Sequence, residues 1–105
     1  MCNLRIDKDE NREWCNSKGE RHRENGPAVE KSNGYKAWWF KGQLHRIDRP
    51  AVEWSNGDKS WWLNGKRHRI NGPAIEYSNG SKSWYLNGIE YTEKEYKVKV
   101  KKCVI

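Results

Sequence analysis

Three histidines and three glutamates are the residues of this chain whose side chains could support acid–base catalysis. Each histidine is followed eight residues later by a glutamate, and each pair recurs after 23 residues. The set comprises His22, His45, His68, Glu30, Glu53 and Glu76. Catalytic groups are placed once, in a pocket with its own environment, whereas these groups repeat along the chain. The recurrence indicates a structural role, so no catalytic residue is assigned and no enzyme activity is expected.

Metal and cofactor sites are not favoured by the spacing either. In a stack of two-stranded repeats, equivalent histidines would lie about 9–10 Å apart, too far for one ion with bonds of about 2 Å. The cysteines, Cys2, Cys15 and Cys103, are odd in number and form no CxxC pair. They fit a reducing compartment, with a Cys2–Cys103 bridge as the open alternative. We therefore expect neither a metal nor a cofactor.

The 23-residue period covers most of the chain and is its strongest signal. The repeated unit reads HRxxGPAxExSNGxKxWWxNGxx. A degenerate copy precedes it in residues 13–19, where Trp14 and Cys15 take the aromatic positions and the turn is one residue longer. Self-similarity at a fixed period is typical of repeat architectures, in which each unit packs on its neighbours.

Each unit contains two turn signals separated by a short aromatic segment. In the middle unit these are Asn56-Gly57 and Asn64-Gly65; Asn-Gly is typical of two-residue hairpin turns with positive φ. The segments between turns have five or six residues, which suits strands and is too short for stable helices. The sequence therefore predicts a mostly β protein, an antiparallel meander of about three hairpin repeats followed by a short C-terminal helix.

The turns also predict which side chains share a face of the sheet. Counting outward from a two-residue turn at Asn56-Gly57, Val52 should face Trp61, and counting from the second turn places His68 near Trp61. One face would then carry Val or Ile, the first Trp and His, and the other Ala, the second aromatic residue and Glu. With two aromatic rows, either the sheet curls over itself or one row is free to bind.

The two ends of the chain differ from the repeats. At the C-terminal end, Thr92 and Glu95 form a capping box and Tyr91 with Tyr96 a hydrophobic staple, which predict a helix over about residues 93–102. An edge strand is the alternative, because KVKVKK alternates. We expect an N-terminal segment (1–12), the repeats (13–90) and a C-terminal helical cap (91–105) that covers one end of the sheet.

The net charge of +7 divides between the repeats, with an excess of four, and residues 91–105, with an excess of three. Arginines cluster just after the second turns and predict a basic ladder along one margin of the sheet. Beside aromatic rows, such a ladder could hold phosphate groups; the candidate phosphate-binding residues are Arg21, Arg23, Arg46 and Arg69. The alternative is that each Arg pairs with the Glu of its own or the next repeat, which the interspersed acidic residues favour.

The positions at which the repeats disagree point to a binding patch in the middle unit. Arg49 stands where the neighbouring units have Gly, and Trp54 stands where they have Lys and Tyr. A repeat scaffold keeps its framework and varies its binding surface. We therefore predict partner-binding residues Arg49, Trp54, Lys59 and Arg67, with Trp54, Lys59 and Trp61 on one face. Neutral variation of surface residues is the alternative.

The repeated residues also resemble a known family. The hairpin with an aromatic pair followed by NGKxH, residues 61–68, resembles the MORN repeat. The pattern HRxxGPAxExxNGxxxWYxNG with a terminal NGxEYTEKEY is similar to short repeat proteins of bacteriophages and some bacteria, over roughly residues 13–96. Arg follows His where MORN repeats tend to have Gly, so the lipid-binding role attributed to MORN proteins is not carried over. The phage-type resemblance implies a small accessory protein that acts inside an infected bacterium.

These observations lead to three hypotheses about function. No apolar run approaches the length that spans a bilayer, and the N-terminus lacks a signal-peptide core, so we expect a location in the bacterial cytoplasm and no membrane partner. The first hypothesis is a non-enzymatic protein that inhibits or sequesters a host component, such as part of an antiviral defence system. The second is a nucleotide or single-stranded nucleic-acid binder. The third is a structural module that forms homo-oligomers.

Overall fold

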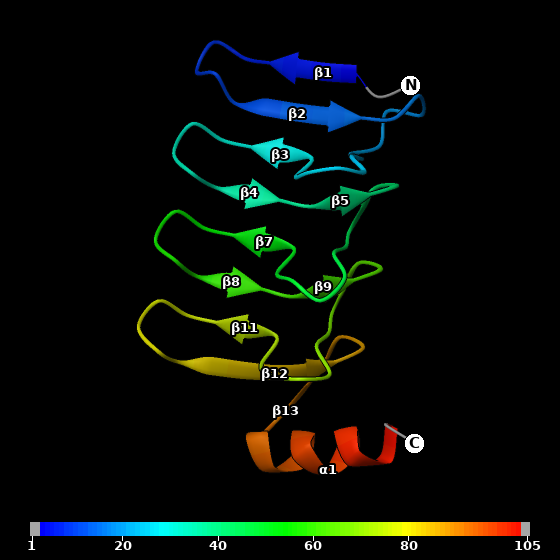
Figure 1. Ribbon diagram of the computed structural model, residues 1–105, viewed down its shortest axis with the longest axis vertical. Coiled ribbons are helices and arrows are strands. Elements are labelled where there is room, and N and C mark those ends of the chain that lie inside the picture. The colour runs from blue at the N-terminus through cyan, green and yellow to red at the C-terminus, as the bar shows by residue number, and fades with distance from the viewer. Residues whose placement is uncertain (1–2, 104–105) are drawn as a thin grey trace.

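The computed structural model describes residues 3–103. Within them, nine strands form one antiparallel sheet in the order β1-β2-β3-β4-β7-β8-β11-β12-β13, and a helix, α1, follows the last strand (Figure 1). The molecule is a slab of 46 × 30 × 18 Å. The first two full repeats each add two strands to the sheet, and the chain then makes a second, small hairpin before it returns. In the third repeat the second hairpin belongs to the sheet, because β12 pairs with β13. The predicted mostly β meander with a C-terminal helix is confirmed, and the sheet does not curl over itself.

The strands of the repeats are short. Those of the main sheet are β1 (Asn3–Ile6), β2 (Arg12–Cys15), β3 (Val29–Glu30), β4 (Lys36–Ala37), β7 (Val52–Glu53), β8 (Lys59–Ser60), β11 (Ile75–Glu76), β12 (Lys82–Leu86) and β13 (Ile89–Tyr91). The two small hairpins consist of β5 (Trp39–Phe40) with β6 (Gln43–Leu44), and β9 (Trp62–Leu63) with β10 (Lys66–Arg67). The helix α1 spans Glu93–Cys103.

The first turn of each repeat is longer than the Asn-Gly signal predicts. In the middle repeat, Trp54 N–H donates to the Asp58 carbonyl and Gly57 N–H donates to the Trp54 carbonyl, at 2.9 and 3.0 Å. Only Gly57 of this turn has positive φ, at 100°, which identifies a three-residue loop that ends in a glycine bulge. Val52 therefore lies opposite Ser60. The predicted pairing of Val52 with Trp61 was wrong by one residue.

The second turn follows its prediction. Asn64 and Gly65 have φ values of 51° and 81°, as a two-residue turn requires, and Arg67 pairs with Trp62. His68 N–H donates to the Trp61 carbonyl at 3.1 Å, so the expected proximity of these two residues is confirmed. The register of the second hairpin is thus correct in the sequence interpretation, while that of the first is shifted.

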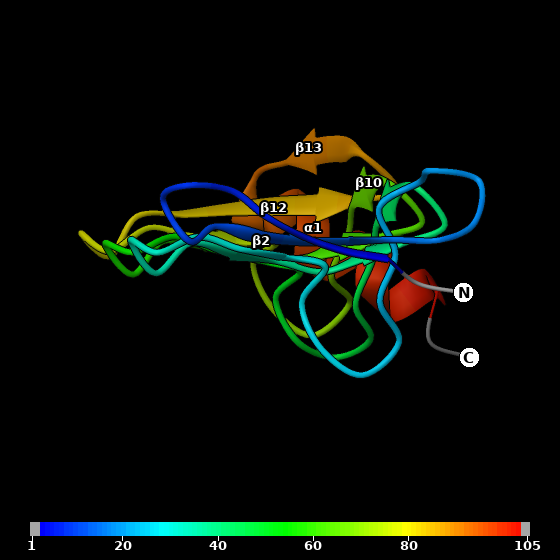
Figure 2. The ribbon, with the colours of Figure 1, turned by 90° about the horizontal axis from the view of Figure 1, so that it is seen from above.

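The shifted register changes the composition of both faces, because a slip of one residue moves every side chain to the other side. What we call the valine face carries Val29, Ala37, Val52, Ser60, Ile75 and Ser83, which are Cα partners in successive strands. The opposite side carries the row of Glu and Lys pairs and the first Trp of each repeat. The segments that lead the chain into the strands of each repeat lie on this side, which we call the loop face (Figure 2). They are the first loop (residues 22–28), the second or middle loop (45–51) and the third loop (68–74).

The core of this single-layer sheet is small and is covered by aromatic side chains. Val29, Ala37 and Val52 are at most 8% exposed, and Trp39 and Trp62 pack against them. Trp62 Nε1 donates to Ser60 Oγ at 2.8 Å, so its indole lies back over the small residues of the valine face. Ala37 occupies the position equivalent to Ser60, and the buried Trp39 Nε1 has no hydrogen-bond partner among the described residues.

The helix α1 closes the C-terminal end of the sheet. Thr92 Oγ1 accepts from Glu95 N–H and Thr92 N–H donates to Glu95 Oε1, at 3.2 and 3.0 Å, which confirms the capping box and rules out the edge strand. Tyr96 is 4% exposed; its ring packs on Trp84 with centroids 6.5 Å apart. At the other end β1 is an exposed edge strand. The possible Cys2–Cys103 bridge falls outside the described residues.

Candidate functional site

One arginine of each repeat fastens that repeat to the one before it. In the middle repeat, the guanidinium Cζ of Arg46 lies 3.7 Å from the ring centroid of Trp38. Its Nη1 lies 3.5 Å from Glu53 Oε2 and donates to the Pro50 carbonyl at 3.1 Å. Burial lowers the pKa of Arg46, opposed by Glu53, while nearby Arg49 lowers it further. Arg23 and Arg69 make the same three contacts in their repeats.

Each repeated histidine accepts a hydrogen bond from a backbone amide of a turn. His45 Nδ1 accepts a hydrogen bond from Asn64 N–H at 3.0 Å, and His68 Nδ1 accepts from Asn87 N–H at 2.9 Å. His22 Nδ1 accepts in the same way from Lys41 N–H at 3.0 Å. A ring nitrogen that accepts from an amide is unprotonated, so the neutral histidine supports this contact. Each histidine therefore holds the second turn of its own repeat.

The candidate phosphate ligands do not form one ladder. Arg23, Arg46 and Arg69 lie on the loop face and are engaged by Glu, Trp and a backbone carbonyl, as the alternative interpretation of Arg–Glu pairing predicted. Arg21 lies on the valine face, where its Nε contacts Glu13 Oε2 at 2.6 Å and its Cζ lies 5.1 Å from the Trp39 ring centroid. The structure thus divides this set between two faces and supplies each member with a carboxylate.

The four predicted partner-binding residues are also divided. Arg49 is exposed at the tip of the second loop, and Lys59 lies on the loop face opposite Glu53. Trp54 is 40% exposed on the valine side, where its ring contacts Tyr35 with centroids 6.1 Å apart. Arg67 lies half-buried between Trp62 and Tyr85, with its Cζ 5.0 and 5.4 Å from their centroids. The structure does not bring Trp54 and Lys59 to one face.

Another departure from the repeat, Asp58, has a structural explanation. Its Oδ1 accepts a hydrogen bond from Ser78 N–H at 2.7 Å, in the first turn of the next repeat. This bond, with a smaller contribution from the Asn56 side chain, lowers the pKa of Asp58. The aspartate at this position therefore links the first turn of the middle repeat to the first turn of the third repeat.

The loop that carries Arg49 differs in its backbone from the other two loops. In the third repeat the equivalent residue is Gly72, where an added Cβ would lie 2.8 Å from the Cζ of Arg69. A side chain at this position therefore requires a shift of the arginine or of the loop, and in the middle loop Asp48 adopts a positive φ of 63°. Asp tolerates this left-handed conformation better than most residues. Ile47, which is 68% exposed, lies in the same loop two residues before Arg49.

The loop face is hollowed between successive loops. A hollow of about 440 Å³ lies between the first and second loops, with Trp38, Phe40 and Ile47 in its lining. A smaller one of about 130 Å³ lies between the second and third loops, lined by Trp61 and Ile70 among others. The same positions of successive repeats line both hollows, so the spacing of the repeats sets the spacing of the hollows.

The exposed Ile47 and Ile70 were missed by the sequence interpretation. Ile70 is 53% exposed, and the first repeat has Glu24 at the same position. The sequence does show an isoleucine directly after the His-Arg pair in two repeats. Because this position lies in a connecting loop and not in a strand, the strand pattern does not predict which residues the isoleucine contacts.

Comparison with known protein families, characterised proteins and solved structures finds no match to this chain. Over residues 3–103, no three His, Cys, Asp or Glu side chains are grouped so that they could hold a metal ion. In the same part of the chain, no helix has the length and apolar character that crossing a membrane requires.

Proposed function

We propose that this protein is a non-enzymatic binding protein that attaches to another protein through its loop face. The observation that carries the proposal is a division of labour among its residues. The repeated Arg, Glu and Trp side chains contact one another and join the repeats, and the repeated His side chains hold turns. In contrast, Ile47, Arg49 and Ile70 project from the loops into solvent.

Exposed apolar side chains beside aromatic hollows are typical features of protein interfaces. Ile47 and Ile70 flank the hollow floored by Trp61, and Arg49 adds a cation to the same loop. Arg and aromatic residues contribute strongly to such interfaces. Of the four residues predicted from sequence, the proposal therefore retains Arg49 and replaces the other three with the isoleucines.

The class of partner rests on the resemblance of the repeat motif to phage-type repeat proteins. On that basis the partner is a bacterial host protein, such as a component of an antiviral defence system, which the bound protein inhibits or sequesters. The nucleic-acid alternative loses support because three of its four candidate phosphate ligands, Arg23, Arg46 and Arg69, are already engaged by Glu, Trp and carbonyl groups.

The proposal is tested by affinity capture from bacterial lysate with matched variants. Wild-type protein should retain one specific host protein, and the variant Ile47→Asp/Ile70→Asp should lose it. Val98→Asp is the control, because Val98 is a 51% exposed aliphatic residue on α1 away from the loops. Retention of the same protein by the isoleucine variant, or an equal loss with Val98→Asp, would contradict the proposal.

A further inference from the structure

A third hollow, of about 460 Å³, lies on the loop face between the third loop and α1. Its lining includes Ile70 and Pro73 from the loop, Trp84 from β12 and Tyr96 from the helix. Ile70 lines both this hollow and the second one, and residues of α1 form the far wall of this hollow. The helix lies beyond the third repeat, where the loop of a next repeat would follow (Figure 1).

The indole of Trp84 is covered differently from its equivalents. An Arg guanidinium lies 3.7–3.8 Å from the ring centroids of Trp14, Trp38 and Trp61. Trp84 instead meets the ring of Tyr96 at 6.5 Å and an interplanar angle of 49°, and no cation is stacked on it within the described residues. Trp84 therefore presents ring surface to the hollow, on which another flat group could stack.

The charge of the third hollow is positive. Lys82, Lys97 and Lys101 contribute to its lining, and Glu93 is the acidic residue among the described lining residues. Lys97 and Glu93 form an ion pair of 3.3 Å, while Lys82 and Lys101 form none within the described residues.

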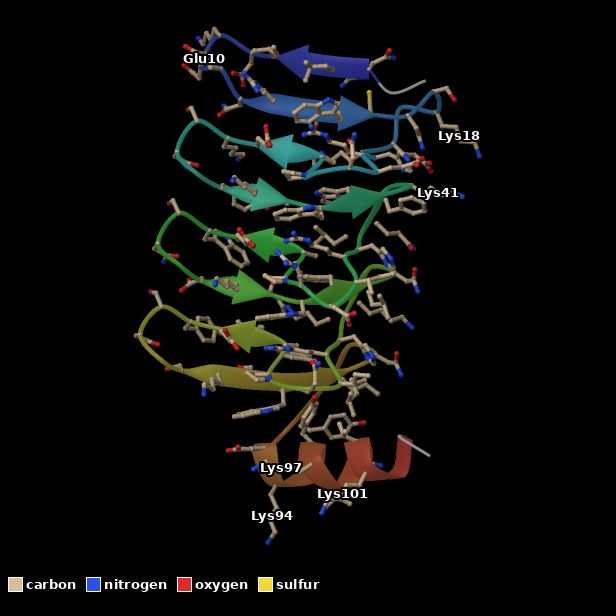
Figure 3. All side chains as sticks on the ribbon, viewed as in Figure 1. Glu10, Lys18, Lys41, Lys94, Lys97 and Lys101 are labelled. Carbon is tan, nitrogen blue, oxygen red and sulfur yellow. The ribbon has the colours of Figure 1, made fainter. Side chains whose placement is uncertain are left out.

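The carboxylate directly across the sheet from Lys82 is already engaged. Glu76 is the Cα partner of Lys82, and it pairs with Arg69 at 3.0 Å. Lys82 thus keeps a cationic group for a ligand. In Figure 3, Lys94, Lys97 and Lys101 all lie on α1 and Lys94 points away from the sheet; of the three, Lys97 and Lys101 contribute to the lining of the hollow. Lysine ammonium groups bind phosphate as point charges.

We infer that the third hollow binds a small anion that carries a flat ring, the chemistry of a nucleoside monophosphate. The ring stacks on Trp84 against the aliphatic wall formed by Ile70 and Pro73, and the phosphate lies at the rim near Lys82 and Lys101. Stacking of a base on an aromatic side chain combined with charge contacts to phosphate is a common mode of nucleotide binding. This site shares Ile70 with the proposed protein-binding surface, whereas Ile47 and Arg49 of the middle loop are not part of its lining.

The test uses adenosine monophosphate (AMP) as the probe and the indole N–H signals of ¹⁵N-labelled full-length protein as the readout. The Trp84 signal is identified with Trp84→Phe. AMP should shift the Trp84 signal in a saturable manner, with a Kd of about 0.1–1 mM, and leave the Trp14 signal in place. Adenosine alone and inorganic phosphate alone should each bind at least about tenfold more weakly.

Charge-matched variants decide whether the lysines of the hollow are responsible. Lys82→Gln/Lys101→Gln should weaken AMP binding about tenfold or more. Lys18→Gln/Lys94→Gln removes the same charge elsewhere and should change it less than about twofold. The inference is overturned if AMP leaves Trp84 unshifted, if adenosine binds as well as AMP, or if both double variants weaken binding equally. The unliganded spectra show whether each variant is folded.

Discussion

Neighbouring repeats are joined by a cation on an indole, whereas the last repeat is joined to α1 by an aromatic ring. Between repeats, Arg69 lies 3.8 Å above Trp61 and is neutralised by Glu76. At the end, Tyr96 packs on Trp84, its hydroxyl donates to the Arg69 carbonyl, and it accepts from Gly72 N–H at 3.1 Å. The first Trp of each repeat is therefore packed against an arginine guanidinium between repeats and against a tyrosine ring at the end of the stack.

The difference explains why the stack ends where it does. An arginine contact requires a carboxylate in its own repeat and leaves a new indole exposed for the next one. Tyr96 requires no carboxylate, and its hydroxyl satisfies backbone groups of the third loop, so the series is closed without a further repeat. Terminal units that differ from the interior ones are a general feature of repeat proteins.

The largest expected effect comes from removing the end cover. Tyr96→Ala should lower the free energy of unfolding by about 3–5 kcal/mol, because a buried aromatic ring and its hydrogen bonds are lost. Tyr96→Phe keeps the ring and should lose only about 1–2 kcal/mol. Urea unfolding measures both. A loss for Tyr96→Ala no larger than that of Tyr77→Ala, at a 41% exposed tyrosine, would contradict the role of Tyr96.

The arginine contact between repeats should contribute less than the end cover. Arg69→Met keeps an aliphatic stem over Trp61 but removes the cation and leaves Glu76 unpaired, so a loss of about 2 kcal/mol is expected. Arg49→Met, at an exposed arginine of the loop face, should stay within about 0.5 kcal/mol of the wild type. Equal losses from the two variants in urea unfolding would show that Arg69 does not join the repeats.

A smaller effect should show whether the repeats are interchangeable. Ala37→Ser places a hydroxyl where Ser60 bonds Trp62 in the next repeat, and it offers a partner to the buried Trp39 Nε1. We expect a gain of about 0.5–1 kcal/mol in the free energy of unfolding, and a loss of similar size for Ser60→Ala. A loss from Ala37→Ser would mean that the two repeats pack differently.

The smallest effect concerns pH and the turns held by histidine. Burial lowers the pKa of His68 below its ordinary value of 6.5, so the unfolded state binds more protons than the folded state as the pH falls below about 6.5. Stability should therefore decrease from pH 7.5 to pH 5.5. His68→Asn retains an acceptor for Asn87 N–H without titrating, so the urea midpoint of this variant should depend less on pH. An unchanged pH dependence would contradict the role of His68.

Much of the architecture could be predicted because the repeat encodes local rules. The 23-residue period, the positive-φ turn at Asn64-Gly65 and the capping box of Thr92 and Glu95 each depend on neighbouring residues. The prediction for the first turn was wrong because Asn-Gly occurs in both two-residue turns and three-residue loops, and these two turn types shift the strand register by one residue. This shift of one residue makes Ser60, and not Trp61, the partner of Val52. It therefore also changes which side chains share each face of the sheet.

The candidate site was less predictable than the fold. Contacts of Arg46 with Trp38 and Glu53 follow the repeat, and the Arg–Glu pairing was anticipated. The course of the connecting loops leaves no periodic trace in the sequence, so the projection of Ile47 and the splitting of Trp54 from Lys59 could be recognised only in three dimensions.

The most direct test of the account is a double-mutant cycle between Trp61 and Arg69, measured by urea unfolding of the wild type, Trp61→Leu, Arg69→Met and the double variant. If the arginine joins its repeat to the preceding one through this indole, the coupling energy should be about 1 kcal/mol in favour of the native pair. Losses that add to within about 0.3 kcal/mol would contradict the claim that this contact holds the repeats together.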